Sequence, residues 1–181
     1  MKKLCKKSLI MTLAAVLLIG TFAISASAVM RKTIKPQEYT KKVSVANRKA
    51  AVVKKGTTNL TFKKGYGYIK FVAPSTKTYT FTFSKLKQSK NVEYPDDYVA
   101  FMAQVKSARY ANKLIKKKLT TKGGQSSSLK MAVNKPAEFY SDKKVDWYEM
   151  TRTGKVKLKK GQAIYFWLNG TEKITGKLVI K

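Results

Sequence analysis

Apolar and polar residues alternate with a period of two along much of the chain. Between residues 78 and 84, Tyr79, Phe81 and Phe83 alternate with threonines, which is typical of a strand with one buried face. The same reading gives four further strands, at residues 68–73, 97–105, 163–168 and 177–181. The second and third of these are apolar on both faces, which predicts positions in the middle of a sheet.

Helical periodicity is weak in the rest of the chain. The best helix candidate is the segment ANKLIKKKL at residues 111–119, which fits an edge strand blunted by lysines nearly as well. Residues 43–46 read as a further edge strand. Short breaks rich in Gly, Pro, Asn, Asp and Ser separate the strands, with no helices between them. This arrangement predicts an all-β fold, an antiparallel β-sandwich.

The tripeptide Lys-Lys-Gly occurs three times, ending at Gly56, Gly65 and Gly161. The second and third copies each lie between an alternating apolar pair and the next apolar strand. Glycine supplies the positive backbone angle that such a turn needs. We therefore interpret the motif as a turn rather than a dedicated binding loop. The sequence leaves open whether the lysines of these two turns share one rim.

The first 28 residues have the features of a cleavable signal peptide. A cationic start, MKKLCKK, precedes an apolar run at residues 9–24 and the small residues ASA. A membrane anchor is the alternative, but the run is short for a hydrocarbon core of ~30 Å. We expect a signal peptide at 1–28, a polar lead-in at 29–48 and one β-sandwich domain at 49–181, in a secreted protein that its charge could hold at the cell wall.

Basic residues greatly outnumber acidic ones. The chain has 39 Lys and Arg against 9 Asp and Glu, a net charge of +30. Loss of residues 1–28 would remove four lysines and leave +26. The electrostatic field of so large a positive charge favours binding to anionic polymers or surfaces, and it weakens as the salt concentration rises. A compositional preference for lysine is the alternative, although it would not by itself explain the scarcity of acids.

The residues needed for most enzyme chemistry are missing from the sequence. There is no histidine, and the single cysteine, Cys5, lies in the expected signal peptide. Histidine-based triads and thiolate metal sites are thereby excluded. The glycines form neither a phosphate-binding loop nor a dinucleotide fingerprint. Asp142, Asp146 and Glu149 form the only local carboxylate cluster and fit salt bridges better than catalysis. We expect no enzyme activity, no cofactor and no metal.

Aromatic residues and turn lysines are the candidate binding groups. Alternation leaves some aromatic side chains facing away from the core, where they could stack on sugar rings or contact a protein. For Trp167, burial in the core is the stronger alternative. The candidate binding residues are Lys63, Lys64, Tyr66, Tyr68, Trp147, Lys159, Lys160 and Trp167.

Three stretches carry a family resemblance: GYIKFVAPSTKTYTFTFS, an acidic turn before DYVAFM, and GKVKLKKGQAIYFWLNG followed by GKLVIK. Their order resembles the bacterial pre-peptidase C-terminal domain over residues 65–181. The resemblance implies a jelly-roll-like β-sandwich that acts as a non-catalytic accessory or binding module. Lys77 stands where the family tends to have glycine, and the Asp-rich strand is reduced to Asp96 and Asp97. The calcium site of some members is therefore not carried over.

These observations predict a secreted, non-catalytic β-sandwich that binds an anionic polymer or polysaccharide of the cell envelope. The alternative is a protein-interaction module, either an inhibitor or an accessory chain of a secreted enzyme. Nucleic acid should bind only weakly and without sequence preference, through lysines such as Lys116 and Lys118. Specific base recognition relies on bidentate guanidinium contacts, and arginine is scarce here.

Overall fold

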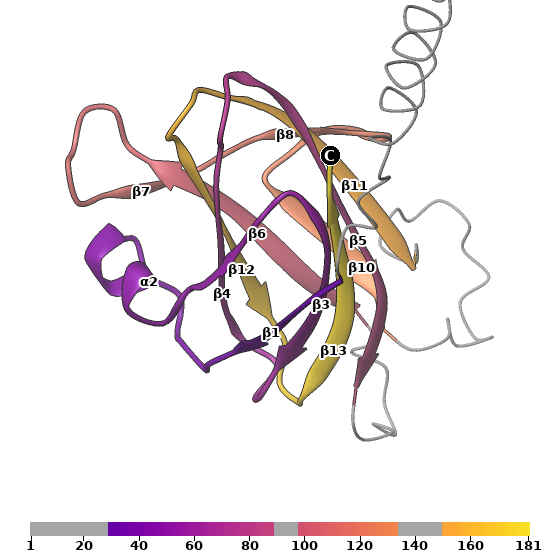
Figure 1. Ribbon diagram of the computed structural model, residues 1–181. Helices are drawn as coiled ribbons and strands as arrows, with labels where there is room; N and C mark the ends of the chain where they lie inside the picture. Colours follow the sequence, from indigo (N-terminus) through magenta and orange to yellow (C-terminus); the bar gives the residue numbers. More distant parts are fainter. Residues whose placement is uncertain (1–28, 89–97, 134–149) are drawn as a thin grey trace, which may run out of the picture.

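The computed structural model describes residues 29–88, 98–133 and 150–181, which fold into two β-sheets packed face to face (Figure 1). The predicted β-sandwich is confirmed. The expected signal peptide, the candidate Trp147, the carboxylate cluster around it and the acidic turn before residue 98 all lie outside the described residues. In the described part of the chain, no helix is long and apolar enough to cross a membrane.

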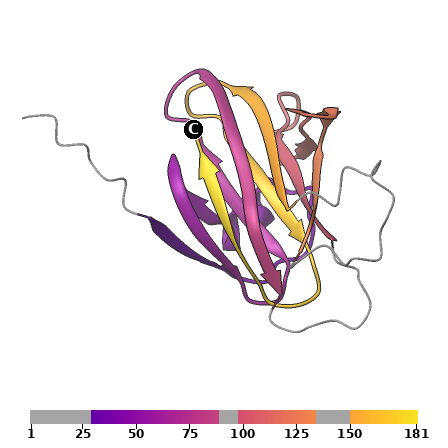
Figure 2. The same cartoon turned by 90° about the vertical axis from the view of Figure 1, so that its right-hand side faces the viewer.

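One sheet has seven strands, in the order β1-β3-β13-β5-β11-β8-β9. Their bounds are Met30–Ile34 (β1), Gly56–Phe62 (β3), Ile174–Ile180 (β13), Lys77–Gln88 (β5), Thr151–Leu158 (β11), Leu119–Thr121 (β8) and Gly124–Ser126 (β9). β13, β5 and β11 lie side by side at the centre of this sheet (Figure 2).

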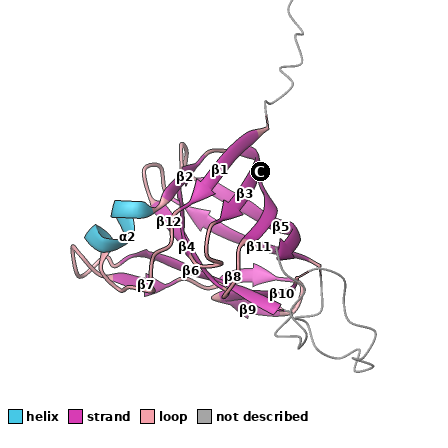
Figure 3. Cartoon of the chain, turned by 90° about the horizontal axis from the view of Figure 1, so that it is seen from below, coloured by secondary structure: helices cyan, strands magenta, loops and turns pink. Residues whose placement is uncertain are grey.

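The other sheet has six strands, in the order β10-β6-β12-β4-β2, with β7 also paired to β6. Their bounds are Ser128–Ala132 (β10), Tyr98–Lys106 (β6), Ala163–Asn169 (β12), Gly67–Val72 (β4), Ala51–Val53 (β2) and Leu114–Lys116 (β7). The short helix α2, Val43–Lys49, lies against the outer side of this sheet (Figure 3).

The main core fills the space between the sheets and follows the predicted alternation. Phe81 and Phe83 of β5 are fully buried, while Thr80 and Thr82, which alternate with them, are half-buried on the outer face. The ring of Phe83 stacks on Phe101, with centroids 3.8 Å apart, and meets Phe166 edge-on at 5.2 Å. β6 and β12, predicted as central strands, are both interior to their sheet. The aromatic alternation therefore sets which face of each strand is buried.

Two strand pairings depart from the antiparallel expectation. β1 runs parallel to β3 at one edge of the seven-stranded sheet, and β2 runs parallel to β4 at one edge of the other. Every other pairing of named strands is antiparallel within the described residues. The sandwich is therefore mixed but mostly antiparallel. Residues 29–48, expected as a lead-in ahead of the domain, supply β1 and all of α2 except its last residue.

One local prediction was wrong, and at a second segment the structure decides between the two alternatives. The expected edge strand at residues 43–46 is the start of α2, because Val43, Ala46 and Ala50 are spaced to share one helical face that packs on the sheet. At residues 111–119 the strand alternative is confirmed over the helix, because β7 and the first residue of β8 lie in this segment. Leu114 packs under α2 whereas Leu119 belongs to the main core, so the two leucines serve opposite sides of the sandwich.

Candidate anion-binding face

The outer face of the six-stranded sheet carries three large aromatic side chains. Tyr68, Tyr165 and Trp167 point away from the main core and form a second apolar cluster. The chain around α2 covers this cluster. Trp167 is only 9% exposed, its Nε1 donates to the Gln37 carbonyl oxygen at 3.0 Å, and its ring meets Tyr39 edge-on at 5.3 Å.

A buried polar network fixes the cover in place. The hydroxyl of Tyr68 accepts from the Thr40 amide at 2.9 Å and lies 3.1 Å from the Thr40 carbonyl oxygen and 3.3 Å from Gln104 Oε1. Gln104 in turn donates to the Tyr39 hydroxyl at 3.2 Å. Burial raises the pKa of Tyr68 to about 12, so its hydroxyl stays protonated at neutral pH. These groups hold the cover over Tyr68 and Trp167, while Tyr98 and Tyr110 are the exposed tyrosines among the described residues.

The aromatic candidates among the described residues pack in or against the second apolar cluster. Tyr68 is fully buried and Trp167 nearly so, which leaves neither ring face open to a ligand, and Tyr66 is half-buried at the margin of the same cluster. Alternation identified the face that these side chains occupy. It could not reveal the cover, for which the spacing of Val43, Ala46 and Ala50 was the available signal.

The second and third Lys-Lys-Gly motifs are turns, and the first is a bend that leads into β3. Gly56, Gly65 and Gly161 all have positive φ, at 111°, 71° and 78°, which confirms the predicted role of the glycine. At Gly65 an added Cβ would also lie 2.2 Å from the Glu172 carbonyl oxygen. This position therefore requires glycine for its space as well as for its backbone angle.

The lysines of the second and third motifs are exposed but lie at opposite ends of the sandwich. Lys63 and Lys64 immediately precede the start of β4, whereas Lys159 and Lys160 precede the start of β12. β4 and β12 are antiparallel neighbours, so their starting ends point in opposite directions. The four candidate lysines do not share one rim.

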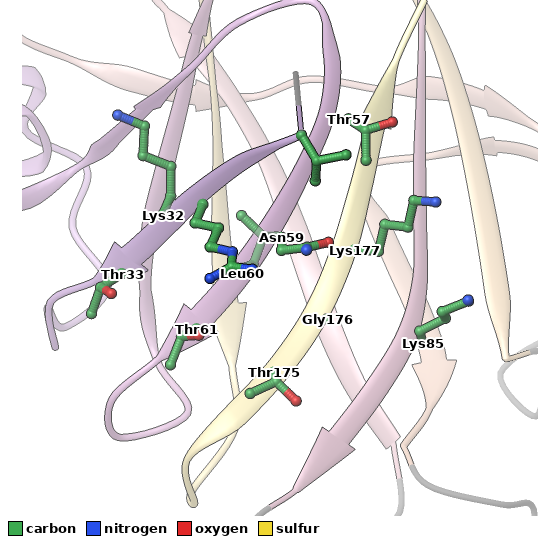
Figure 4. A pocket seen from close by; sticks show the side chains of 12 residues that line it. Lys32, Thr33, Thr57, Asn59, Leu60, Thr61, Lys85, Thr175, Gly176 and Lys177 are labelled. Atoms are coloured by element: carbon green, nitrogen blue, oxygen red, sulfur yellow. The ribbon is translucent and has the colours of Figure 1, made fainter. Parts of the chain in front are cut away.

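The outer face of the seven-stranded sheet contains a hollow of about 640 Å³ (Figure 4). It lies over β1, β3, β13 and β5. Among the described residues that line it, none is acidic and none is aromatic. The lining residues are Val29, Arg31, Lys32, Thr33, Thr57, Asn59, Leu60, Thr61, Lys85, Thr175, Gly176 and Lys177.

Three of these side chains form a row across neighbouring strands. Arg31 of β1 pairs in register with Asn59 of β3, which pairs with Lys177 of β13. Asn59 and Lys177 lie next to each other in Figure 4. Arg31 and Asn59 are exposed and Lys177 is half-buried. A guanidinium, an amide and an ammonium are thus held along one line by the pairing of three strands.

A β-bulge adds a further cation to this face. The pairing of β5 with β13 shifts between Thr175 and Lys177, so that β5 contains one extra residue. Within the described residues, Lys85 is the only non-glycine residue with positive φ, at 55°. Bulges commonly redirect a side chain next to a functional site. Here the exposed Lys85 joins the wall of the hollow beside Lys177 (Figure 4).

The hollow has the chemistry of an anion site. Arginine presents paired N–H donors that match a phosphate or carboxylate, and lysine adds compact charges. The threonine hydroxyls and the Asn59 amide offer neutral hydrogen bonds beside them. No group of three or more His, Cys, Asp or Glu able to hold a metal ion occurs in the part of the chain that the structure describes. The arrangement can bind and orient an anion.

Sequence reasoning did not single out any residue of this hollow. Arg31 lies in a segment taken for a lead-in, and Lys85 is indistinguishable by sequence from the other lysines. The available signal was the outward-facing threonines that alternate with buried residues on β3 and β5. Such alternation marks a solvent-facing sheet surface, but it does not show which cations gather over it.

No protein-family model matches this chain, and a search of curated proteins finds no significant match.

The Lys85→Gly variant is expected to be more stable by ~0.5–1 kcal/mol, because glycine adopts positive φ without the Cβ clash that lysine suffers there. Denaturant unfolding measures the change. The matched control is Lys87→Gly, which removes the same charge two residues along the same strand and should destabilise by ~0.5–1 kcal/mol. Equal destabilisation by both variants would contradict the strained bulge.

Proposed function

We propose that the protein is a secreted, non-catalytic β-sandwich that binds an anionic polymer of the cell envelope. One observation carries the proposal: the sequence has 39 Lys and Arg but only 9 Asp and Glu, a net charge of +30. A surface with so few acids attracts polyanions from a distance, because few of its cations can be neutralised by the protein's own carboxylates. The cationic hollow is the part of the fold where such a polyanion would bind.

The aromatic residues support charge recognition over sugar stacking. A stacking platform needs exposed ring faces, and Tyr68 and Trp167 are covered. The proposal therefore rests on the charge of the polymer rather than on its sugar rings. The similarity to the pre-peptidase C-terminal domain in the order of strands and turns supports a non-catalytic binding role of the same kind, with a jelly-roll-like chain path.

The purified protein is expected to co-sediment with isolated cell envelopes at low salt and to be released near 1 M salt, where the screening length falls to ~3 Å. The control is the same envelope preparation stripped of its anionic polymers, which should retain much less protein. Sedimentation followed by quantitation of the bound fraction measures both. Absence of retention at low salt, or equal retention on stripped envelopes, would overturn the proposal.

A further inference from the structure

We infer that the hollow over β1, β3, β13 and β5 seats a linear polymer of phosphodiester-linked polyols or sugars, with successive phosphates held along the row of cations. The inference rests on the proposed function and gives it a site and a ligand class. It follows from three features of the hollow: the extent of the cation row and, among the described residues that line it, the absence of carboxylates and the absence of aromatic rings.

The cations are spread over more than one phosphate's width. Arg31 and Lys177 stand on strands two places apart, and Lys85 is on the next strand along. With neighbouring strands ~4.8 Å apart, the backbones of Arg31 and Lys85 are separated by ~14 Å across the sheet. A single phosphate cannot span that distance, whereas a chain crossing the strands meets a cation at both ends of the hollow. The row therefore favours a ligand with repeated charges.

The remaining lining groups suit a polyol phosphate. Its phosphate oxygens match the paired donors of the Arg31 guanidinium. Its linker hydroxyls can exchange hydrogen bonds with the Asn59 amide and the threonine hydroxyls of the neighbouring strands. Among the lining residues that the structure describes, no carboxylate competes for the cations or repels the polymer.

The same lining argues against single-stranded nucleic acid. Proteins that bind such strands combine a basic groove with aromatic side chains on which successive bases stack. The described lining of the hollow contains no aromatic residue. A nucleic acid could therefore use the charge of this face but not the base stacking, and it should bind less tightly than a polyol phosphate with equal numbers of phosphates.

The test uses oligomers of phosphodiester-linked glycerol with two, four and eight phosphates, titrated into the purified protein at one fixed ionic strength. Affinity should rise more steeply than the number of phosphates, because additional phosphates on one chain reach additional cations without a new encounter. Two comparison ligands carry eight charges each: a single-stranded DNA and a uronic-acid oligomer. Both should bind more weakly, and tighter binding of either would overturn the assigned ligand class.

Two variants with the same loss of charge locate the site. Arg31→Gln/Lys85→Gln/Lys177→Gln changes the hollow, whereas Lys116→Gln/Lys118→Gln/Lys159→Gln changes exposed lysines elsewhere. The first should weaken the eight-phosphate ligand by about 30-fold, the size of one charge-assisted hydrogen bond, because exposed charges are screened by solvent. The second should weaken it by about threefold through the lower overall charge. Circular dichroism and thermal unfolding check that both variants fold.

A single substitution tests the location of the site independently. Arg31→Lys keeps the charge but loses the paired donors, so it should weaken binding by about three- to tenfold. Equal losses in the two triple variants, or no loss in Arg31→Lys, would overturn the site while leaving envelope binding by the wild-type protein intact. Failure of the wild-type protein to bind envelopes at all would instead overturn the proposed function, and the inference with it.

Discussion

The Phe83→Ala variant is expected to lose ~3–5 kcal/mol of its free energy of unfolding. Phe83 is fully buried between the sheets, stacked on Phe101 and edge-on to Phe166. Removing its ring leaves a cavity between strands of both sheets, and those strands cannot collapse into it without losing their pairing. Denaturant unfolding followed by circular dichroism and by tryptophan fluorescence measures the loss.

The control for Phe83→Ala is Thr78→Ala on the same strand. Thr78 is exposed, so this substitution should change the free energy of unfolding by less than ~0.5 kcal/mol. A loss below ~1.5 kcal/mol in Phe83→Ala, which is well short of the usual cost of truncating a buried phenylalanine, would contradict the packing described between the sheets.

The Trp167→Ala variant is expected to lose a similar ~3–5 kcal/mol, for a different reason. Trp167 belongs to the second cluster, outside the main core, and its ring anchors the cover through Tyr39 and the Gln37 carbonyl. Loss of the ring should free residues around α2 as well as open a cavity. Hydrogen exchange of the α2 amides, measured beside denaturant unfolding, should therefore show lower protection in this variant.

The matched variant is Trp167→Phe, which keeps most of the ring but cannot donate to Gln37. It should cost ~1–3 kcal/mol, the range for a buried polar group left without its partner, and should retain protection in α2. If Trp167→Ala left the exchange of α2 unchanged, the covering role of that segment would be refuted even with a large loss of stability.

The sequence predicted the main core because strand alternation is a local property. Phe81 and Phe83 fall on one face whatever the rest of the chain does, and β12 reads as buried on both sides from its composition alone. The parallel pairings of β1 and β2 were not predictable in this way, because alternation fixes the face of a strand but not its neighbour or direction. A helix of seven residues likewise offers only two turns of periodicity.

The candidate site depended still more on non-local information. The burial of Trp167 depends on a segment 130 residues earlier, which strand alternation alone does not show. The bulge at Lys85 requires positive φ at a residue type that rarely adopts it, which no sequence pattern marks. The row of Arg31, Asn59 and Lys177 exists only once β1, β3 and β13 are paired.

The pairing of β3 with β13 also constrains the order of folding. Residues 56–62 form their ladder with residues 174–180, and the cover around Gln37 needs Trp167. Contacts this distant in sequence require closure of long loops, and proteins dominated by them typically fold in milliseconds to seconds rather than microseconds. The early strands therefore have no complete partner surface until synthesis reaches the last strand. A nascent chain that ends before residue 163 lacks both β12 and β13, so it can form neither the cover nor the cationic hollow.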